Sequence, residues 1–582
     1  MEKVLVIGID AMDQRIINRL DLPNLKSLQT RKKLETTIPP ETPVAWSAAS
    51  TGTNPGKYGI FDFINRNPKT YLPKLNLTNE KRGIIKTEYS CAMQGKPFWK
   101  ILNEKGIPST VMRWPVTFPA EKIDGKMLSG LGVVDVKGML NKYSYYSSEN
   151  EKNEEDTGNI IKIPEEKNFE TYVSGPLIMK SGALKDVRTP LRVTIQENGV
   201  NLNLNGKEYF VKEKSWSEMI SVKFKIYLMN VYGIFKVYLK SIKPFKMYMT
   251  SIQVDPTNQI YPITYPKEYG KELVENIGLF YTLGMTEDTK AITENKISYD
   301  VFLQQINQIE NEREKMFEYE FKKFNKGVFA FAFDAGDRLK HLFWSDKTDS
   351  EGMPITIPEP IKRYYTQKDK FIGNVLSRIS ENTKLLIFSD HGFNSFKWQF
   401  NLNSWLVKEG FMKVNTREGK LLQYVDWNKT QAYSLGFTSA YLNLKGRESK
   451  GILTNTNLVD EIIKKLRTIN HNGRKVFTNV YKGNEIYKGA YAELAPDMIV
   501  GFSPEYRMSD KSAIGILENE IINKNTSKWS GDHLIDRSHV PGVLFANFKT
   551  SKEFPNIMDI APTTLKLFNI NPPEHMDGES LI

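Results

Sequence analysis

Cysteine is nearly absent from this chain of 582 residues, in which Cys91 is the only one. An internal disulfide is therefore excluded, and cysteine usage gives no sign of a secreted, disulfide-dependent fold. An apolar run that reads as a buried strand begins at Val4, and a removable signal peptide has no room before it. We therefore expect a cytoplasmic protein.

Long hydrophobic runs are absent as well. The most membrane-like stretch, residues 226–235, carries no charge and is flanked by Lys225 and Lys236. It is well short of the ~20 apolar residues that a membrane-spanning helix requires. We expect no spanning helix, although contact between residues 219–249 and a membrane surface stays an alternative.

The overall composition is that of a globular protein, with 40% hydrophobic and 25% charged residues. The length allows a large core and more than one folded unit. A net charge of +12 is compatible with an anionic substrate, nucleic acid or an anionic membrane. A solvated, lysine-rich surface is the simpler interpretation, and no basic block with interleaved aromatic residues predicts a nucleic-acid groove.

Strand and helix signals alternate in both halves of the chain. The run VLVIGID at 4–10 is almost continuously apolar, which is typical of a strand buried on both faces, and residues 384–389 are predicted to form another buried strand. Apolar residues at helical spacing predict helices over residues 14–20, 22–28, 98–105, 301–324 and 364–379. This alternation predicts an α/β fold with a mostly parallel sheet covered by helices on both faces.

The middle of the chain has a different pattern. Residues 118–252 are rich in Gly, Lys, Tyr and Asn, and the segment LRVTIQENGVNLNLNGKEYFVKE carries turn signals between β-prone runs. We expect a β-rich insertion at 118–252 in a core formed by residues 1–117 and 253–582. The polar segment 150–158 is predicted to be a loop.

Aspartate and histidine recur in four short segments, three of them beside or just after an apolar run. The candidate metal ligands are Asp10, Asp337, His341, Asp390, His391 and His533. Ligand sites of parallel sheets gather at the carboxyl ends of the strands. A single aspartate there is more often a cap or turn residue, and a buried, hydrogen-bonded histidine is the common alternative. Three aspartates, two of them paired with histidine, favour a site for zinc, manganese or iron.

A hydroxyl group that could act as a nucleophile follows the first of these segments. Thr42, Ser47, Ser50 and Thr51 are all candidates in TIPPETPVAWSAAST. A hydroxyl is a weak nucleophile unless a base or a metal ion lowers its pKa. Each of the four could equally be a capping or turn residue, and spacing alone does not choose among them.

Taken together, these segments resemble the alkaline phosphatase superfamily, and within it the type I phosphodiesterase/nucleotide pyrophosphatase-like branch with its predicted phosphohydrolase/phosphomutase group. The motifs that carry the resemblance are GID at 8–10, TIPPETPVAWSAASTGTNPGKYGIFDF at 37–63, DRLKHLFW at 337–344, SDHGF at 389–393, SGDH at 530–533, and the closing MDIAPTTLKLFNI and MDGESL. They span the core and leave out the insertion. The resemblance implies an alkaline-phosphatase-like three-layer core.

The resemblance also assigns roles to the candidate residues. It implies that Thr42, ten residues before Gly52, is the nucleophile. One divalent ion would be held by Asp10, Asp390, His391 and the Thr42 oxygen, and a second by Asp337, His341 and His533. Zinc is expected, with manganese or iron as alternatives. His539 is a rival of His533, which is preferred because SGDH matches the motif of the family.

Two departures from the family pattern affect the substrate. Nucleotide pyrophosphatases carry an asparagine after a Gly-Ile pair, and the position in register here is Phe63, which leaves nucleotide specificity open. Alkaline phosphatases proper use an arginine for the phosphate oxygens, and no clear equivalent is visible. Lys57, Arg338 and Lys340 lie in the motif segments, but we expect them to be solvated.

The implied reaction is metal-dependent hydrolysis of a phosphate ester, a diester rather than a monoester, through a phospho-threonine intermediate. A phosphomutase and a monoester phosphatase are the alternatives. A sulfatase is disfavoured because no C/S-x-P-x-R pattern surrounds Thr42, and a non-catalytic binding module because all candidate ligands are present. The substrate would be a small phosphate ester or one linked to lipid or sugar. No nucleic acid is expected, and the oligomeric state stays open.

Overall fold

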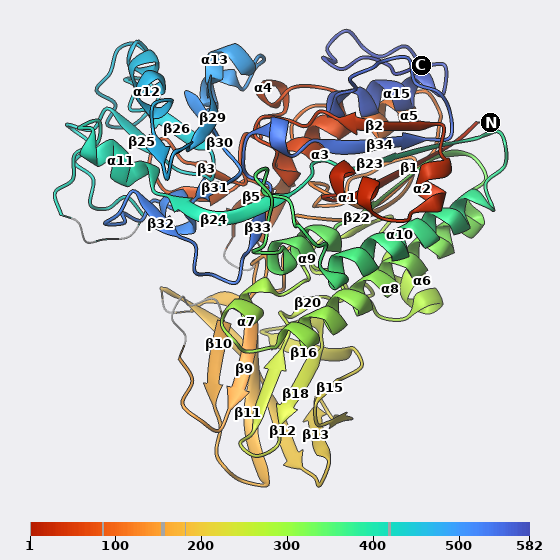
Figure 1. Ribbon diagram of the computed structural model, residues 1–582. Helices are drawn as coiled ribbons and strands as arrows, with labels where there is room; N and C mark the ends of the chain where they lie inside the picture. The colour runs from red at the N-terminus through yellow and green to blue at the C-terminus, as the bar shows by residue number, and fades with distance from the viewer. Residues whose placement is uncertain (1, 84–86, 153–157, 181, 417–418, 420) are drawn as a thin grey trace. The chain divides into compact units, whose positions relative to one another are not determined.

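The computed structural model describes residues 2–83, 87–152, 158–180, 182–416, 419 and 421–582 (Figure 1). The chain divides into two compact units. Unit 1 comprises residues 1–78, 92–109 and 325–582, and unit 2 comprises residues 79–91 and 110–324. Every element named between residues 118 and 252 is a strand, while the limits expected for the insertion stay a prediction. Part of the predicted loop at 150–158, residues 153–157, lies outside the described residues.

A central sheet organises unit 1. The strands that unit 1 contributes run in the order β2 (Thr30–Leu34), β34 (Gly542–Ala546), β23 (Thr383–Phe388), β1 (Lys3–Ile9) and β22 (Gly327–Phe333). β1 is parallel to both β22 and β23, whereas β34 is antiparallel to β23 and to β2. The three parallel strands are almost entirely buried, as their continuous apolar runs predict. The predicted α/β class is confirmed.

Helices cover both faces of this sheet. α10 contacts α2 and α9, and α15 contacts α3 and α5. Figure 1 shows α2 and α10 below the strands and α5 and α15 above them. The bounds are α1 (Gln14–Arg19), α2 (Pro23–Ser27), α3 (Thr42–Thr51), α4 (Pro55–Tyr58), α5 (Phe98–Glu104), α9 (Ala335–Phe343), α10 (Glu359–Leu376) and α15 (Ile560–Lys566). The predicted helices of this unit therefore form within a few residues of their expected limits.

Two further small sheets of unit 1 share one apolar cluster, which includes Phe400, Tyr433, Phe477 and Met498. The first contains β31 (Glu505–Met508), β24 (Asn394–Phe400), β32 (Ile522–Lys524) and β33 (Gly531–Asp532). The second contains β25 (Ala432–Ser434), β26 (Ser439–Leu442), β30 (Met498–Phe502) and β29 (Phe477–Lys482). Helices α11 (Leu402–Lys408), α12 (Leu458–Leu466), α13 (Gly483–Ile486) and α14 (Asp510–Ala513) accompany them.

Unit 2 is built mostly of antiparallel strands. One sheet contains β10 (Gly158–Lys162), β9 (Tyr143–Ser147), β19 (Lys246–Met249), β18 (Val237–Ser241) and β15 (Ser215–Trp216). Another contains β11 (Asn168–Lys180), β12 (Ala183–Ile195), β13 (Gly199–Leu204) and β14 (Lys207–Lys212), and a third β16 (Ile220–Ile226), β17 (Met229–Phe235) and β20 (Gln253–Val254). The predicted turn at Asn205 and Gly206 joins β13 to β14, and both residues have positive φ, as a tight hairpin requires.

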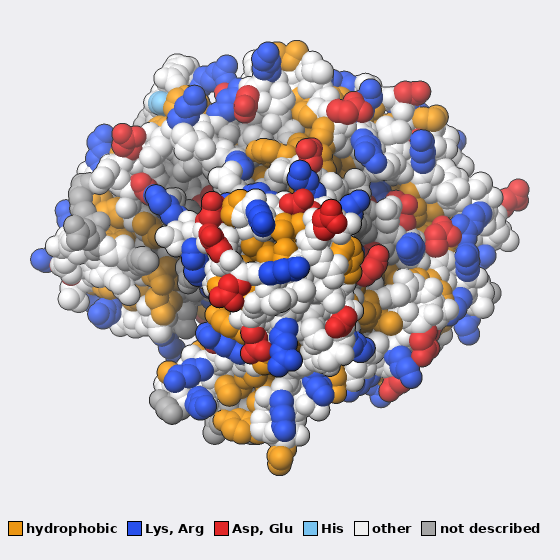
Figure 2. Space-filling model, turned by 90° about the horizontal axis from the view of Figure 1, so that it is seen from below, with side chains coloured by type: hydrophobic (Ala, Val, Ile, Leu, Met, Phe, Trp, Pro, Cys, Tyr) orange, Lys and Arg blue, Asp and Glu red, His pale blue; other side chains and the backbone are white. Residues whose placement is uncertain are grey.

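The remaining elements of unit 2 are β5 (Thr78–Arg82), β6 (Thr87–Cys91), β7 (Ser109–Trp114), β8 (Gly125–Ser129), β21 (Thr264–Tyr265), α6 (Tyr269–Ile277), α7 (Thr289–Thr293) and the long α8 (Tyr299–Lys323). Within the described part of the chain, no helix has the length and apolar character needed to cross a bilayer. The uncharged stretch 226–235 instead ends β16 and forms β17. On the face shown in Figure 2, basic and acidic side chains are interspersed, which fits the expectation of a solvated basic surface.

Candidate metal centre

The four aspartate and histidine segments meet at one edge of the central sheet. Asp10 follows β1, and Asp390 and His391 follow β23. β22 leads through Asp334 into α9, which carries the second aspartate–histidine pair. Because β1, β22 and β23 are neighbouring parallel strands, their carboxyl ends lie at the same edge, as the sequence predicts. All six candidate ligands are buried.

The first group of ligands consists of Asp10, Asp390 and His391. One potential ligand atom from each lies within 4.8 Å of the others. Nε2 of His391 is 3.1 Å from Oδ2 of Asp390 and 3.7 Å from Oδ1 of Asp10. Oγ1 of Thr42 lies 3.3 Å from the same nitrogen. The hydroxyl that the resemblance assigns as nucleophile therefore borders this group.

The second group consists of Asp337, His341 and His533, whose ligand atoms also lie within 4.8 Å of one another. Asp337 and His341 are one turn apart in α9, with Nε2 of His341 at 3.3 Å from Oδ2 of Asp337. Nε2 of His533 is 3.5 Å from Oδ1 of Asp337. The two groups adjoin, because the rings of His391 and His533 stack with centroids 3.7 Å apart.

The three histidines are oriented to present a lone pair to these groups. Nδ1 of His341 bonds to the carbonyl of Gly531 at 2.7 Å, Nδ1 of His391 to that of Gly392 at 3.0 Å, and Nδ1 of His533 to that of Pro40 at 2.7 Å. A carbonyl oxygen only accepts, so each Nδ1 carries the proton and donates it. The Nε2 atoms are left as the ligand atoms, which is the arrangement typical of metal-binding histidine.

Several carboxylate oxygens at the site lack a hydrogen-bond donor among the described residues. They are both oxygens of Asp10, Oδ1 of Asp337 and Oδ2 of Asp390. A buried carboxylate without a partner is costly, so these oxygens call for a cation. Three carboxylates and three imidazoles form a mixed donor set that suits zinc, manganese or iron. The residues present therefore fit two divalent metal ions.

The pKa shifts of these buried side chains also favour a bound cation. Burial, followed by the charge of Asp390, raises the pKa of Asp10 well above its ordinary value, and burial raises the pKa of Asp390 to about 7. Burial lowers the pKa of both His391 and His533. Burial also acts to raise the pKa of Asp337, but His341 and Arg338 outweigh it and hold that pKa well below its ordinary value. Positive charge between these groups would stabilise all three carboxylates in the ionised form.

The structure distinguishes Thr42 from the other candidate hydroxyls. Ser47, Ser50 and Thr51 lie inside α3, and each donates to the carbonyl four residues earlier, at 2.7, 2.7 and 2.8 Å respectively. Thr42 is the first residue of α3, where its hydroxyl reaches His391. Gly8 allows this placement, because a Cβ there would lie 2.0 Å from the ring of Trp46 in α3. The close approach of α3 to β1 brings its first residue to the strand end.

Two basic residues in the motif segments contradict the expectation that they are solvated. Arg338 and Lys340 are buried because α9 packs against α10. The guanidinium of Arg338 lies 2.6 Å from Oδ2 of Asp337. The ammonium of Lys340 donates to the carbonyl of Gly336 at 3.1 Å, and burial lowers its pKa to about 8. Only Lys57 stays partly exposed, in an ion pair with Asp577 at 2.6 Å.

Other residues around the ligands were not anticipated from the sequence. Trp529 stacks on His341 with ring centroids 3.9 Å apart. Oδ2 of Asp532 accepts from Nε1 of Trp529 at 2.9 Å and lies 3.1 Å from Nε of Arg507. Oδ1 of Asp532 accepts from the amide of His533 at 2.8 Å, and Oδ2 of Asp532 lies 3.7 Å from Nδ1 of His341, so this carboxylate contacts two candidate ligands. Asp532 belongs to the SGDH motif and could have been found there, whereas Trp529 and Arg507 carry no sequence signal.

Phe63 and His539 are also placed by the structure. The amide of Phe63 donates to Oε2 of Glu41 at 2.6 Å, and its ring packs against the apolar cluster of the two small sheets. It therefore offers no polar side-chain group to a phosphate oxygen. His539 contacts the hydroxyl of Thr478 at 2.8 Å and belongs to neither ligand group.

Comparison with known proteins adds a family assignment to this geometry. The family model described as type I phosphodiesterase/nucleotide pyrophosphatase matches residues 4–174 and 245–533, which include Thr42 and all six candidate ligands. The unmatched residues 175–244 lie inside the predicted insertion. A search of curated proteins finds no match.

Solved structures similar to this chain include human ectonucleotide pyrophosphatase/phosphodiesterase 5, at 11% identity and a TM-score of 0.43, covering 99% of this chain and 97% of that chain. The murine enzyme has 11% identity and a TM-score of 0.40, with the same coverage of both chains. An inactive variant of the murine enzyme in complex with AMP has 11% identity and a TM-score of 0.41, again with this coverage.

Proposed function

The chain belongs to the type I phosphodiesterase/nucleotide pyrophosphatase family of the alkaline phosphatase superfamily, and we propose that it cleaves a phosphate diester through a covalent intermediate on Thr42. The enzyme class that the resemblance implied is confirmed, and the protein is a phosphoric ester hydrolase. The observation that carries the proposal is the position of Oγ1 of Thr42, 3.3 Å from Nε2 of His391, at the border of a buried ligand group.

We assign two divalent ions to the ligand groups, since the family is typically two-metal dependent. Asp10, Asp390 and His391 would hold one ion together with the Thr42 oxygen, and Asp337, His341 and His533 the other. Zinc is proposed because three of the six side chains are imidazoles, with manganese or iron as alternatives. When bound, the ions neutralise phosphate charge and favour the ionised forms of the hydroxyl and of water.

The residues of the chain then perform a double displacement. Oγ1 of Thr42 forms a bond to phosphorus, the bond to the leaving alcohol breaks, and that alcohol departs with the electron pair and a proton. Water next cleaves the bond between phosphorus and Oγ1, which regenerates the hydroxyl and releases the phosphate monoester. Thr42 begins α3, so the dipole of the helix favours the negative charge that gathers on the phosphoryl oxygens.

A diester is favoured over a monoester because the nearby cation, Arg338, is already paired and does not serve a phosphate oxygen. A monoester carries more negative charge, and alkaline phosphatases proper bring an arginine to its oxygens. Here Arg338 is committed to Asp337 at 2.6 Å. A singly charged diester makes the smaller demand on the protein. A phosphomutase stays the second candidate, and the cytoplasmic location expected from the sequence stays a prediction.

The test is a screen of the metal-reconstituted enzyme with bis-p-nitrophenyl phosphate and p-nitrophenyl phosphate. We expect faster turnover of the diester and a loss of at least about 10³-fold in Thr42→Ala, with metal content nearly unchanged. Ser50→Ala is the matched control, because that hydroxyl is bound inside the same helix, and it should stay active. Near-wild-type turnover by Thr42→Ala would reject the nucleophile. A separate incubation with a labelled sugar phosphate tests the alternative, and isomerised ester without released phosphate would favour the phosphomutase.

A further inference from the structure

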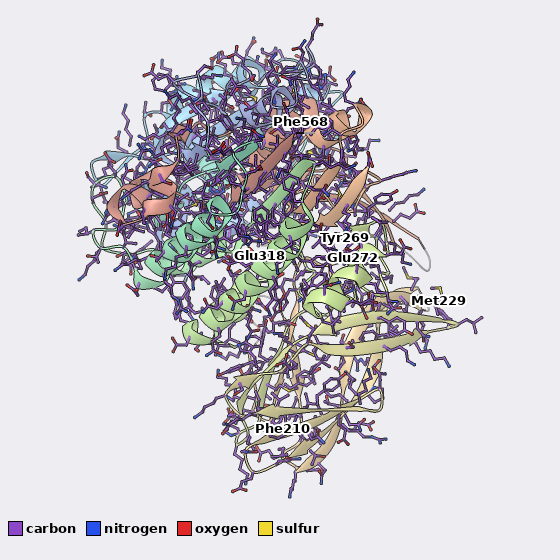
Figure 3. The ribbon with its side chains drawn as sticks, turned by 90° about the vertical axis from the view of Figure 1, so that its right-hand side faces the viewer. Phe210, Met229, Tyr269, Glu272, Glu318 and Phe568 are labelled. Carbon is purple, nitrogen blue, oxygen red and sulfur yellow. The ribbon has the colours of Figure 1, made fainter. Side chains whose placement is uncertain are left out.

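An apolar turn projects from unit 2 at the end of the β16–β17 hairpin. Ile226 of β16 pairs with Met229 of β17, and Tyr227 and Leu228 form the turn between them. The side chains of Tyr227, Leu228 and Met229 have exposed fractions of 67%, 102% and 51%. Figure 3 shows Met229 at the far end of this hairpin. Three consecutive large apolar side chains in solvent are unusual and mark a contact site.

A second hairpin brings more apolar surface to the same place. Met179 of β11 pairs with Leu184 of β12, and the two residues have exposed fractions of 49% and 46%. Residues of both hairpins line one cavity of about 430 Å³. The hydroxyl of Thr189 in β12 donates to the carbonyl of Lys223 in β16 at 3.1 Å, so the two hairpins are joined directly. Tyr227, Leu228, Met229, Met179 and Leu184 therefore form one apolar rim.

The charge around this rim is predominantly basic. Lys223 and Lys225 alternate with buried apolar residues along β16 and point to solvent. Among the residues that the structure describes, neither ammonium has an ion-pair partner. Lys180 and Lys185 are exposed beside Met179 and Leu184. Two acidic residues lie nearby: Glu80 lines the cavity, and Asp186 pairs with Arg188 at 3.1 Å. A basic collar around an apolar tip is complementary to an anionic surface that has an apolar interior.

We infer that this rim, formed by residues 227–229 together with Met179 and Leu184, docks unit 2 on an anionic lipid bilayer. The apolar side chains would enter the acyl layer, and the lysines would stay among the lipid phosphates. A tyrosine at the boundary suits the headgroup level. Three side chains on a projecting turn offer less than the roughly 800 Å² that each partner of a stable protein interface buries. A lipid bilayer is fluid and can close around the turn, so binding to it does not require a protein-sized interface.

The test is co-sedimentation of the full-length protein with vesicles of phosphatidylcholine alone and of phosphatidylcholine mixed with phosphatidylglycerol. The wild-type protein should bind the mixed vesicles and bind the neutral ones more weakly. A triple variant with Tyr227→Ser, Leu228→Ser and Met229→Ser should lose at least about tenfold in affinity. Phe210→Ser is the matched control, because Phe210 on β14 is 52% exposed and lies outside the rim, and its binding should not change.

A second pair of variants tests the lysines that surround the apolar tip. Lys223→Gln and Lys225→Gln should each weaken binding to the anionic vesicles by about fivefold and leave the neutral vesicles unaffected. Leu228→Gln alone checks the tip at a fully exposed position, where folding should not be disturbed, and adds no charge. The inference is overturned if the wild-type protein binds neither vesicle, if the triple variant and Leu228→Gln bind like the wild type, or if the variants instead abolish a dimer in vesicle-free solution.

Discussion

At the scale of single residues, the site depends on which ring nitrogen of each histidine carries the proton. Nδ1 donates a hydrogen bond to a backbone carbonyl in His341, His391 and His533, so that every Nε2 faces an aspartate. The residue types were predicted from the sequence, because aspartate and histidine at strand ends suggest metal. The carbonyl partners could not be predicted, because Gly531 and Pro40 come from segments distant along the chain. The roles of the ligands stay proposals.

Replacing one histidine should separate the two ligand groups. His533→Asn should lower bound metal from two ions per chain to one and reduce diester turnover by at least about 100-fold, because Asp337 and His341 alone offer too few ligands. Elemental analysis of the purified protein and a turnover assay measure both effects. His539→Asn provides the control, since His539 contacts Thr478 outside the groups. Equal metal loss in both variants would contradict the assignment of His533.

At the scale of elements, the order of strand and helix was readable in advance. Continuous apolar runs predicted β1 and β23. Helical spacing of apolar residues predicted α1, α2, α5 and α10, with bounds within a few residues of those observed. The two-residue strand β33, which delivers His533, has no period to detect. The burial of Lys340 was also missed, because helical periodicity describes one buried face and α9 is buried almost throughout.

The contact between β1 and α3 gives a test at this scale. Gly8→Ala would place a Cβ 2.0 Å from the ring of Trp46, so strand and helix must separate. We expect a loss of about 2 kcal/mol in the free energy of unfolding, and lower turnover because Thr42 begins the displaced helix. Denaturant unfolding and the diester assay measure these effects. Trp46→Leu combined with Gly8→Ala should recover part of the stability, and no recovery would argue against a steric cause.

At the scale of the whole molecule, each unit has its own apolar cluster, and the site lies within unit 1. A β-rich insertion was expected from turn signals such as Asn205-Gly206, which do form a hairpin. The limits of unit 2 at 79–91 and 110–324 were not predicted. They depend on contacts between segments distant in sequence, and composition does not record such contacts.

The stability of the folded chain should depend on a partly buried acid in unit 2, Glu312. Burial raises the pKa of Glu312 from 4.5 to about 7, although the amide of Tyr281 donates to it at 2.9 Å. The folded state therefore holds this proton more tightly than the unfolded state. Its contribution is fully present below about pH 4.5 and is lost as the pH rises through 7.

Glu312→Gln should remove this part of the pH dependence. Between pH 4.5 and 7.5 the free energy of unfolding of the wild type should fall. In the variant we expect this fall to be smaller by up to about 3 kcal/mol. Urea unfolding across that range measures the difference. A wild-type protein and a variant with parallel pH profiles would show that Glu312 ionises normally in the folded state.

The central claim is that Thr42 becomes covalently bound to the substrate phosphorus. The most direct measurement is acid quenching of the metal-loaded enzyme during turnover of a slow diester, followed by mass spectrometry of its peptides. The account predicts that the transferred group is found on Thr42 in the wild type and in Ser50→Ala, and is absent in Thr42→Ala. A modified residue other than Thr42, or full turnover by Thr42→Ala, would contradict it.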